Sequence, residues 1–521
     1  MGLFFLCLHL FSWQNSQASE LVIPKKTPFI WHPFSMESEE DLYVLNLVHR
    51  PLLQVDKEGT WSCRGCRTFE MASESRPIRF TLTLDPAWRW SDGKPISVED
   101  FLLSWEIAKA MRQRNRLVAS WQEVEVITPS TTEPGRLELQ MARAVYPYHF
   151  LGAMYPLPAH QEGPVWKQCQ KNVACYLQQS LFQTGGNWVS TGPYRMESLS
   201  GEMAILKQNS HFAKKPMIST IRIQRGKLPK EGAVFWPETA FPPWSTDLDT
   251  ILANYKNVQQ ILVPLYALEQ ISFNLRSSLL RDIQVRKALQ VALDLPLLVG
   301  EGGIPAAQFT HPLDPFFIAP STETVTTLSK IEQARILLRQ ANWKENKAGA
   351  FYKQNRKLVV ELAISPNRMS LTKRIQAQWR KIGVEVEIQV QTPDGFQQEV
   401  LGTGQFSGGV LYTLQRTPNY SAAHLFDSSR EPHTGRRNSA FNLFRWSSLR
   451  MDQWIFQFDR MLDEDDRRKS WPKVEEMLRE DMPLIPLYFH QGHAAATVNL
   501  QLGALTPFVP TSMGVETWTL R

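Results

Sequence analysis

The segment FTLTLDPAWRWSDGKPISVEDFLLSW, residues 80–105, decides the fold. Its apolar residues Phe80, Leu82 and Leu84 alternate with threonines, and this period of two predicts a strand with one buried face. Residues 91–94, Ser-Asp-Gly-Lys, then bring turn-forming residues together, including a glycine that can adopt a positive φ. The segment therefore predicts a strand that ends in a tight turn.

A helix is expected directly after this turn. The hydroxyl of Ser97 can accept a backbone N–H near Asp100, and Glu99 and Asp100 place negative charge at the positive end of the helix. Apolar residues then repeat at helical spacing and form the stripe expected to face the core: Phe101, Trp105 and Ala108.

A second unit, of strand, helix and strand, lies in the last third of the chain. Residues 358–364 and 384–390 have strand patterns, and the apolar residues of 371–382 recur at helical spacing before Gly383, which can end a helix. Upstream, Arg281-Asp282 opens another amphipathic helix. A strand-helix-strand unit implies a right-handed crossover between parallel strands, so the predicted class is α/β with mixed sheets and helices.

The composition describes a large folded protein. The chain has 521 residues, 43% hydrophobic and 21% charged, which is ordinary globular usage and excludes disorder and coiled coil. The net charge of +6 is too small and too spread out to predict a nucleic-acid partner. The charged run at residues 463–469 is expected to be a solvated helix face.

The first residues indicate export. Residues 2–13 are mostly apolar and are followed by Ser16-Gln17-Ala18, the small-residue pattern that a signal peptidase reads. We therefore expect residues 1–18 to be a cleaved signal peptide, although no Lys or Arg precedes the apolar run. The run is too short to span a bilayer as a helix. Cleavage would also remove Cys7.

Four cysteines then remain in an oxidising compartment: Cys63, Cys66, Cys169 and Cys175. An even number favours two disulfides. The spacing of Cys63 and Cys66 also suits a redox pair or half of a zinc site, but no second CxxC or histidine pair follows at zinc-ribbon spacing.

The segment 80–105 strongly resembles the signature of the family 5 extracellular solute-binding proteins, the oligopeptide- and dipeptide-binding components of ABC importers. The shared pattern is a strand ending in aromatic residues, then W-S-D-G-x-P, then a helix that opens with a hydroxyl residue and an acidic-Phe pair. Residues 191–194, 273–292 and 379–390 resemble further family segments in the same order.

The resemblance implies a three-domain periplasmic binding protein-like clam of class II, cluster C, which closes on a ligand between domains I and III. The implied division is 19–51, 189–265 and 491–521 for domain I, 52–188 for domain II, an appendage, and 266–490 for domain III. In the family, an extended peptide adds as a strand to the protein backbone, and this gives affinity without reading side chains.

The resemblance also locates the ligand contacts. In the family, an Asp after a strand of domain III binds the peptide amine. Here the corresponding stretch, residues 406–420, has Arg416 at that place, or Asn419-Tyr420 if a short insertion is allowed. We expect the ligand to contact the end of this stretch: Tyr412, Thr413, Leu414, Gln415, Arg416, Asn419 and Tyr420.

The missing acid leaves alternatives open. Asp394 or Asp427 could bind the amine instead. Alternatively, the solute could be a non-peptide or amine-blocked molecule, glutathione-like or a metal chelate, that presents no free amine at this place. Arg416 could hold a carboxylate or phosphate, or be a surface arginine with a structural ion pair. An arginine there would repel an ammonium group about 4 Å away by roughly 4 kcal/mol.

A secreted hydrolase is the rival class, and a surface protein that has lost transport is a third. The chain has no G-x-S-x-G, H-E-x-x-H or P-loop motif. His490 and His493 could offer two metal ligands, but no adjacent acid or cysteine completes a site. We therefore expect a monomeric periplasmic receptor, free or membrane-associated, which needs no cofactor or resident metal and delivers its solute to ABC permease subunits in the inner membrane.

Overall fold

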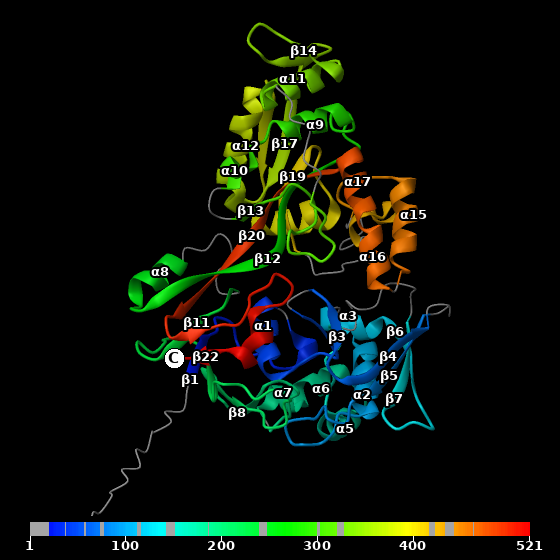
Figure 1. Ribbon diagram of the computed structural model, residues 1–521, viewed down its shortest axis with the longest axis vertical. Helices are drawn as coiled ribbons and strands as arrows, with labels where there is room; N and C mark the ends of the chain where they lie inside the picture. Colours follow the sequence, from blue (N-terminus) through cyan, green and yellow to red (C-terminus); the bar gives the residue numbers. More distant parts are fainter. Residues whose placement is uncertain are drawn as a thin grey trace, which may run out of the picture.

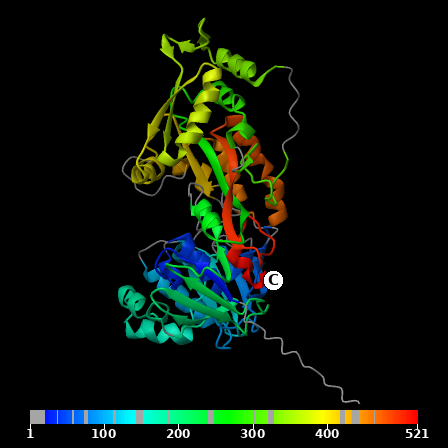
Figure 2. The same cartoon turned by 90° about the vertical axis from the view of Figure 1, so that its left-hand side faces the viewer.

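The computed structural model describes residues 20–36, 38–56, 59–72, 78–111, 116–141, 152–185, 187–238, 247–299, 303–319, 328–415, 423–432, 442–461 and 463–521. Figures 1 and 2 show two lobes, one above the other. We call residues 20–257 and 498–521 the lower lobe and residues 274–483 the upper lobe. The predicted signal peptide and Cys7 lie outside the described residues.

One large mixed sheet runs through both lobes (Figure 1). Its order is β18 (Glu385–Val390), β17 (Val359–Ile364), β19 (Gly409–Gln415), β12 (Val258–Phe273), β20 (Leu484–Thr497), β11 (Ala233–Trp236), β1 (Glu20–Pro24), β10 (Thr220–Gln224), β9 (Met203–Gln208) and β8 (Tyr194–Leu199), with β13 (Gly303–Pro305) also on β20. The long antiparallel strands β12 and β20 connect the lobes.

The connecting ladder is irregular where it passes from one lobe to the other. Pro264 pairs with Gln491 and Leu268 pairs with Phe489, so three residues of β12 lie opposite one residue of β20. Proline at this place has no N–H to give to the ladder. Beyond the irregularity, β12 pairs with β19 on its other side from Ala267 to Phe273.

The upper lobe has helices on both faces of its sheet. α9 (Ile283–Val291), α11 (Lys330–Gln340) and α12 (Met369–Lys381) contribute to one core, and α15 (Leu449–Phe458) and α17 (Pro472–Asp481) contribute to the other. β17, α12 and β18 form the predicted strand-helix-strand unit with parallel pairing. Gly383, at φ +79°, follows the helix as expected. Asp282 caps α9 by accepting the N–H of Gln284 at 3.0 Å.

The segment that decides the fold lies in the lower lobe. β5 (Arg79–Leu84) buries Phe80, Leu82 and Leu84 in a four-stranded antiparallel sheet with β4 (Cys66–Ala72), β7 (Arg136–Met141) and β6 (Val124–Pro129). α2 (Val98–Ala110) follows the turn, with Ser97 as its N-cap residue, whose N–H donates to Asp100 Oδ2 at 2.8 Å. Of the predicted stripe, Phe101 and Ala108 are buried, whereas Trp105 is half-buried and donates its indole N–H to the Val124 carbonyl at 2.8 Å.

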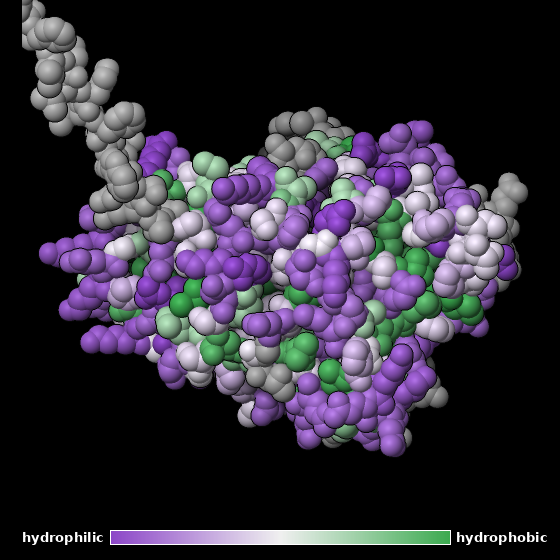
Figure 3. All heavy atoms as spheres, turned by 90° about the horizontal axis from the view of Figure 1, so that it is seen from below, coloured by the Kyte–Doolittle hydropathy of each residue, from purple (hydrophilic) through white to green (hydrophobic). Residues whose placement is uncertain are grey.

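The remaining lower-lobe strands and α-helices are β2 (Leu53–Val55), β3 (Trp61–Cys63), β21 (Leu500–Gln501), β22 (Thr519–Leu520), α1 (Glu39–Val48), α3 (Arg116–Gln122), α5 (Ala159–Gln168), α6 (Val173–Gln179), α7 (Leu181–Thr184) and α8 (Asp247–Asn254). One continuous core joins residues from β1 to β11 and from the end of the chain. Figure 3 shows this lobe from below, with a largely hydrophilic face and hydrophobic side chains gathered toward the four-stranded sheet, where Val126 is 40% exposed. The predicted domain boundaries remain a prediction.

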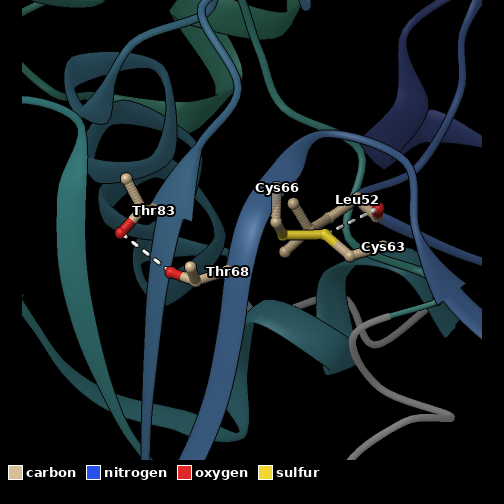
Figure 4. Close-up of a disulfide and its surroundings, with 5 residues drawn as sticks. All are labelled: Leu52, Cys63, Cys66, Thr68 and Thr83. Atoms are coloured by element: carbon tan, nitrogen blue, oxygen red, sulfur yellow. Dashed lines mark hydrogen bonds between the residues drawn. A yellow bond between two sulfur atoms is a disulfide. The ribbon is translucent and has the colours of Figure 1, made fainter.

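The four predicted cysteines form two disulfides. Cys63 pairs with Cys66 and Cys169 pairs with Cys175. Figure 4 shows the first pair at the start of β4, with Cys63 Sγ 3.6 Å from the Leu52 carbonyl oxygen. This bond ties the hairpin β2–β3 to the four-stranded sheet.

The charged run at 463–469 is only in part the solvated face that we expected. It forms most of α16 (Glu464–Ser470), and Asp465, Arg468 and Lys469 are exposed. Arg467, however, is fully buried. Its guanidinium lies over the ring of Phe458 and donates to the Phe458 carbonyl at 2.6 Å, which compensates for burial of the charge.

Candidate functional site

Three strands of the upper lobe end toward the lower lobe. β12 enters the upper lobe from below, and β19 runs antiparallel to it, so that Gln415 at the end of β19 lies opposite Ala267 near the lobe junction. β17 and β18 are parallel to β19 and end on the same side. The carboxyl ends of parallel strands are the usual place for a ligand in an α/β sheet.

The end of β19 has an incomplete ladder. β17 pairs with β19 only at Leu362–Gly409 and Ala363–Val410. In the described part of the chain, residues 411–415 pair with β12 and with no strand on the other side. Backbone N–H and C=O groups on an unpaired strand edge can accept a further strand.

The predicted contact residues are placed differently along this strand. Tyr412 is buried and its hydroxyl accepts from the Gln270 side chain at 2.9 Å, so its side chain belongs to the core. Leu414 is half-buried and packs on two core clusters, Thr413 is half-buried, and Gln415 is exposed. Arg416, Asn419 and Tyr420 lie outside the described residues, so their predicted contacts stay predictions.

Thr413 belongs to a buried polar cluster that the sequence did not predict. Arg368, just before α12, donates from Nε to Glu269 Oε1 at 2.6 Å and from Nη2 to Thr413 Oγ1 at 2.8 Å. His490 Nε2 lies 3.0 Å from Glu269 Oε2 and 3.2 Å from Thr413 Oγ1. The cluster therefore fastens β12, β19, β20 and the start of α12 to one another beside the open edge.

The charge on Glu269 is stabilised within this cluster. Burial alone would raise the pKa of Glu269, but the hydrogen bond with His490 and the nearby Arg368 guanidinium outweigh burial and hold the pKa below its ordinary value. Burial, followed by the Glu269 charge, raises the pKa of Tyr488 on the same strand as His490. Because Arg368 also donates to Ser365 Oγ at 2.7 Å, its guanidinium holds the strands together and is not free for a solute.

The two alternative amine partners differ in availability. Asp427 caps a short 3-10 helix by accepting the N–H of Ser429 at 2.8 Å and lies 3.8 Å from Arg430. Asp394 lies in α13 (Pro393–Gly395), which follows β18 at the same sheet edge, and it is exposed. Of the two carboxylates, that of Asp394 is the more exposed.

The histidines considered as metal ligands serve other roles. His490 is held in the Glu269 cluster, and His493 lies 2.7 Å from the Gln260 side chain. Across the described ranges, no group of three or more His, Cys, Asp or Glu side chains is placed to hold a metal ion.

The lobes also meet at a small apolar contact. Tyr266, in the irregular part of β12, packs with Phe508 and with Val55 of β2, and its hydroxyl donates to Asp314 of the upper lobe. Gly59, which follows β2, also lies against the upper lobe. It packs so closely on Pro315 that a Cβ at position 59 would collide with the proline ring.

One feature of the sequence points to the polar cluster around Glu269. Glu269 is the only acid in β12, an otherwise mainly apolar strand of 16 residues, and a buried acid requires a partner. The identity of that partner could not be read from the sequence, because Arg368 and His490 lie about 100 and 220 positions away and are brought together only by strand pairing.

Comparison with known proteins agrees with this architecture. The family model "Bacterial extracellular solute-binding proteins, family 5 Middle" matches residues 74–428. The probable deoxycholate-binding periplasmic protein of Escherichia coli strain K12 is 22% identical over 471 residues, which cover 84% of this chain and 82% of that protein. The periplasmic murein peptide-binding protein of the same organism is 22% identical, over 78% of this chain and 76% of its own.

A solved structure shows the same fold. The oligopeptide-binding protein AppA of Bacillus subtilis, in complex with a nonapeptide, superimposes with a TM-score of 0.63 at 16% identity, covering 96% of this chain and 99% of that one. No helix in the described ranges is both long and apolar enough to cross a membrane. The family model spans well over half of the sequence, and the chain belongs to the family 5 bacterial extracellular solute-binding proteins.

Proposed function

We propose that this protein is an exported receptor that binds a short peptide along the open edge of β19 and delivers it, chemically unchanged, to the permease subunits of an ABC importer. The observation that carries the proposal is the unpaired edge at residues 411–415, beside the lobe junction. Two relatives support it, since one is named for murein peptides and another was solved with a nonapeptide.

The polar cluster supports a backbone-reading site. Arg368 and Glu269 fix the position of Thr413, and Tyr412 anchors the other face of β19 in the core. A strand held on both faces presents its edge in one conformation, which lowers the entropic cost of pairing with a peptide. Recognition would then rest mainly on main-chain hydrogen bonds, with side chains of the peptide tolerated broadly.

The direct test uses peptides that lack selected amide hydrogens. Tryptophan fluorescence would follow titration with tri- to penta-alanine peptides and with the same peptides N-methylated at alternate residues. Strand addition predicts that one set of methylated positions abolishes binding and the alternate set is tolerated, because alternate N–H groups point to the same edge. Equal affinity for all forms would overturn the proposal.

The amine of the peptide is proposed to meet Asp394. Asp394→Asn is expected to weaken binding of a free-amine peptide about tenfold and to leave the N-acetylated peptide unchanged, because only the ammonium requires a countercharge. Asp427→Asn, whose carboxylate already caps its own helix, is the matched control. Equal losses for the two peptide forms would remove Asp394 from this role.

A second candidate is a solute that has a carboxylate and no amine. It is favoured by Arg416, which stands where the family pattern has an acid if the stretch is aligned without a gap, and by the relative named for deoxycholate. If this candidate holds, deoxycholate quenches fluorescence where peptides do not, and Arg416→Ala abolishes that response. Mass spectrometry of molecules that co-purify with the protein separates the two candidates independently.

A further inference from the structure

One surface of the upper lobe, from α12 to the end far from the lower lobe, carries a dense positive charge. Residues 330–381 contain 13 Lys and Arg against 3 Asp and Glu, a difference of +10, although the whole chain has a net charge of only +6. This span forms α11, the small hairpin sheet β14 (Lys344–Glu345), β15 (Phe351–Lys353) and β16 (Arg356–Lys357), then β17 and α12. Figures 1 and 2 place α11 and the hairpin sheet at the end of the molecule opposite the lower lobe, with β17 and α12 running from that end toward the lobe junction.

The acids in this span are already engaged. Glu332 and Glu345 both pair with Arg339, at 2.9 and 2.8 Å, and Glu345 also pairs with Arg335 at 3.0 Å. Glu361 accepts from Gln389 at 2.8 Å. Eight cations are exposed and form no ion pair with any described residue: Lys330, Lys344, Lys347, Arg356, Lys373, Arg374, Arg380 and Lys381.

Four of these cations follow one face of α12. Lys373 and Arg380, and Arg374 and Lys381, are each seven positions apart, which is two helical turns, so all four lie on the solvent side. The opposite face buries Leu371, Ile375 and Trp379. Arg335 of α11 donates to the Lys381 carbonyl at 2.9 Å, so this row continues into the basic elements at the tip. We call the eight cations the basic cap.

Exposed apolar side chains border the basic cap. Leu297 is 64% exposed on α10 (Leu295–Val299), and the N–H of Asp294, just before α10, donates to Gln378 of α12 at 2.6 Å. Leu328 and Ile331, 48% and 39% exposed, flank Lys330 at the start of α11. Unpaired cations with a few apolar side chains at their margin fit the surface of an anionic bilayer, where headgroups meet charge and acyl chains meet apolar groups.

We propose that the basic cap holds this protein at the surface of membranes rich in anionic phospholipid. The charge is distributed over α11, α12 and a hairpin rather than set in a groove, so it matches a fluid layer of phosphates better than one shaped protein surface. The proposal rests on surface charge alone, so it stands whether the solute is a peptide or another molecule.

The test compares two variants with the same loss of charge. The first replaces the α12 row, as K373Q, R374Q, R380Q and K381Q together. The control replaces four exposed lower-lobe lysines, as K214Q, K215Q, K227Q and K230Q. Each full chain is sedimented, in physiological salt, with vesicles of phosphatidylcholine alone or with about a third phosphatidylglycerol. Residues 1–18 hold no Lys or Arg, so preference for the anionic vesicles does not come from that segment.

We expect the wild-type chain and the control to prefer the anionic vesicles, and the α12 variant to lose at least about tenfold of that preference. Equal loss in both variants would overturn the proposal, because net charge alone would then explain binding. Absence of a preference in the wild-type chain would overturn it too. The proposal would also be overturned if the protein bound only to neutral vesicles that contain permease subunits. That result would show that the basic cap binds an acidic protein surface. Near-ultraviolet circular dichroism confirms that each variant is folded.

Discussion

Arg368 and Glu269 form an ion pair, 2.6 Å from Nε to Oε1, that ties the start of α12 to the central strand of the upper lobe, and their side chains are only 14% and 2% exposed. Removing one partner would leave the other charge buried without its partner. We expect Arg368→Ala or Glu269→Ala to lower the free energy of unfolding by about 3–5 kcal/mol, measured by urea denaturation.

An exposed ion pair provides the comparison for this prediction. Arg339 pairs with Glu332 and Glu345, but its side chain is 46% exposed. Arg339→Ala should therefore cost about 1 kcal/mol or less. Similar losses for Arg339→Ala and Arg368→Ala would show that burial does not strengthen the Glu269 pair.

Stability should fall in mild acid because two histidines are buried in neutral form. Burial lowers the pKa of His32 and of His49 to about 3, against 6.5 for an ordinary histidine, and for His49 the neighbouring His32 adds to the effect. Below pH 6.5 the unfolded chain binds protons that the folded chain does not, so each histidine removes about 1.4 kcal/mol per pH unit down to pH 3.

The contribution of one histidine can be isolated. His49 is stacked on Trp188, with ring centroids 5.5 Å apart, and a phenyl ring can take its place. His49→Phe should flatten the dependence of unfolding free energy on pH between about 4 and 6 by about 1.4 kcal/mol per unit. An unchanged slope in this variant would contradict the assignment.

Gly383 should tolerate no side chain. It has φ +79°, and a Cβ there would collide with the Gly349 carbonyl oxygen. We expect Gly383→Ala to lower the unfolding free energy by about 1–3 kcal/mol, through strain and overpacking together. Gly201→Ala, with open space around it, should change stability by less than about 0.5 kcal/mol in the same thermal or urea experiment.

Each disulfide closes a short loop, so each should contribute modestly to stability. The paired cysteines are 3 and 6 positions apart. Chain-entropy reasoning gives about 2 kcal/mol for either loop. Replacing Cys63 and Cys66 with serine, or Cys169 and Cys175 with serine, should lower stability by that amount. Dithiothreitol should not lower further the stability of a variant in which all four cysteines are serine. A loss on reduction of the wild-type chain larger than the loss caused by replacing all four cysteines would indicate another redox-sensitive group.

The local elements could be predicted from the sequence because their signals are local. The alternation around Phe80, the cap at Ser97 and the stop at Gly383 each depend on residues a few positions apart, and all three are confirmed. The buried Arg467 was expected in solvent, because its partner Phe458 belongs to another helix and the charged run gives no sign of it.

The site was less accessible to sequence reasoning. The resemblance led to β19, and the structure brings its open edge to the lobe junction, but the role of Glu269 depends on the register of three strands from distant parts of the chain. Strand register is set by the whole sheet and not by any one segment. Tyr412 shows the same limit, because only the pairing of β19 with β12 reveals that its ring faces inward.

The pairing of β12 with β20 brings together the two points at which the chain enters and leaves the upper lobe. Both β1 and β22 lie in the lower lobe, and the chain departs along β12 and comes back along β20, its hydrogen-bonded neighbour. The upper lobe is thus topologically an insert within a polypeptide whose exit and re-entry points are adjacent. The gene segment that encodes one upper lobe could therefore be replaced by the segment for another, with no change in the path of the chain through the lower lobe.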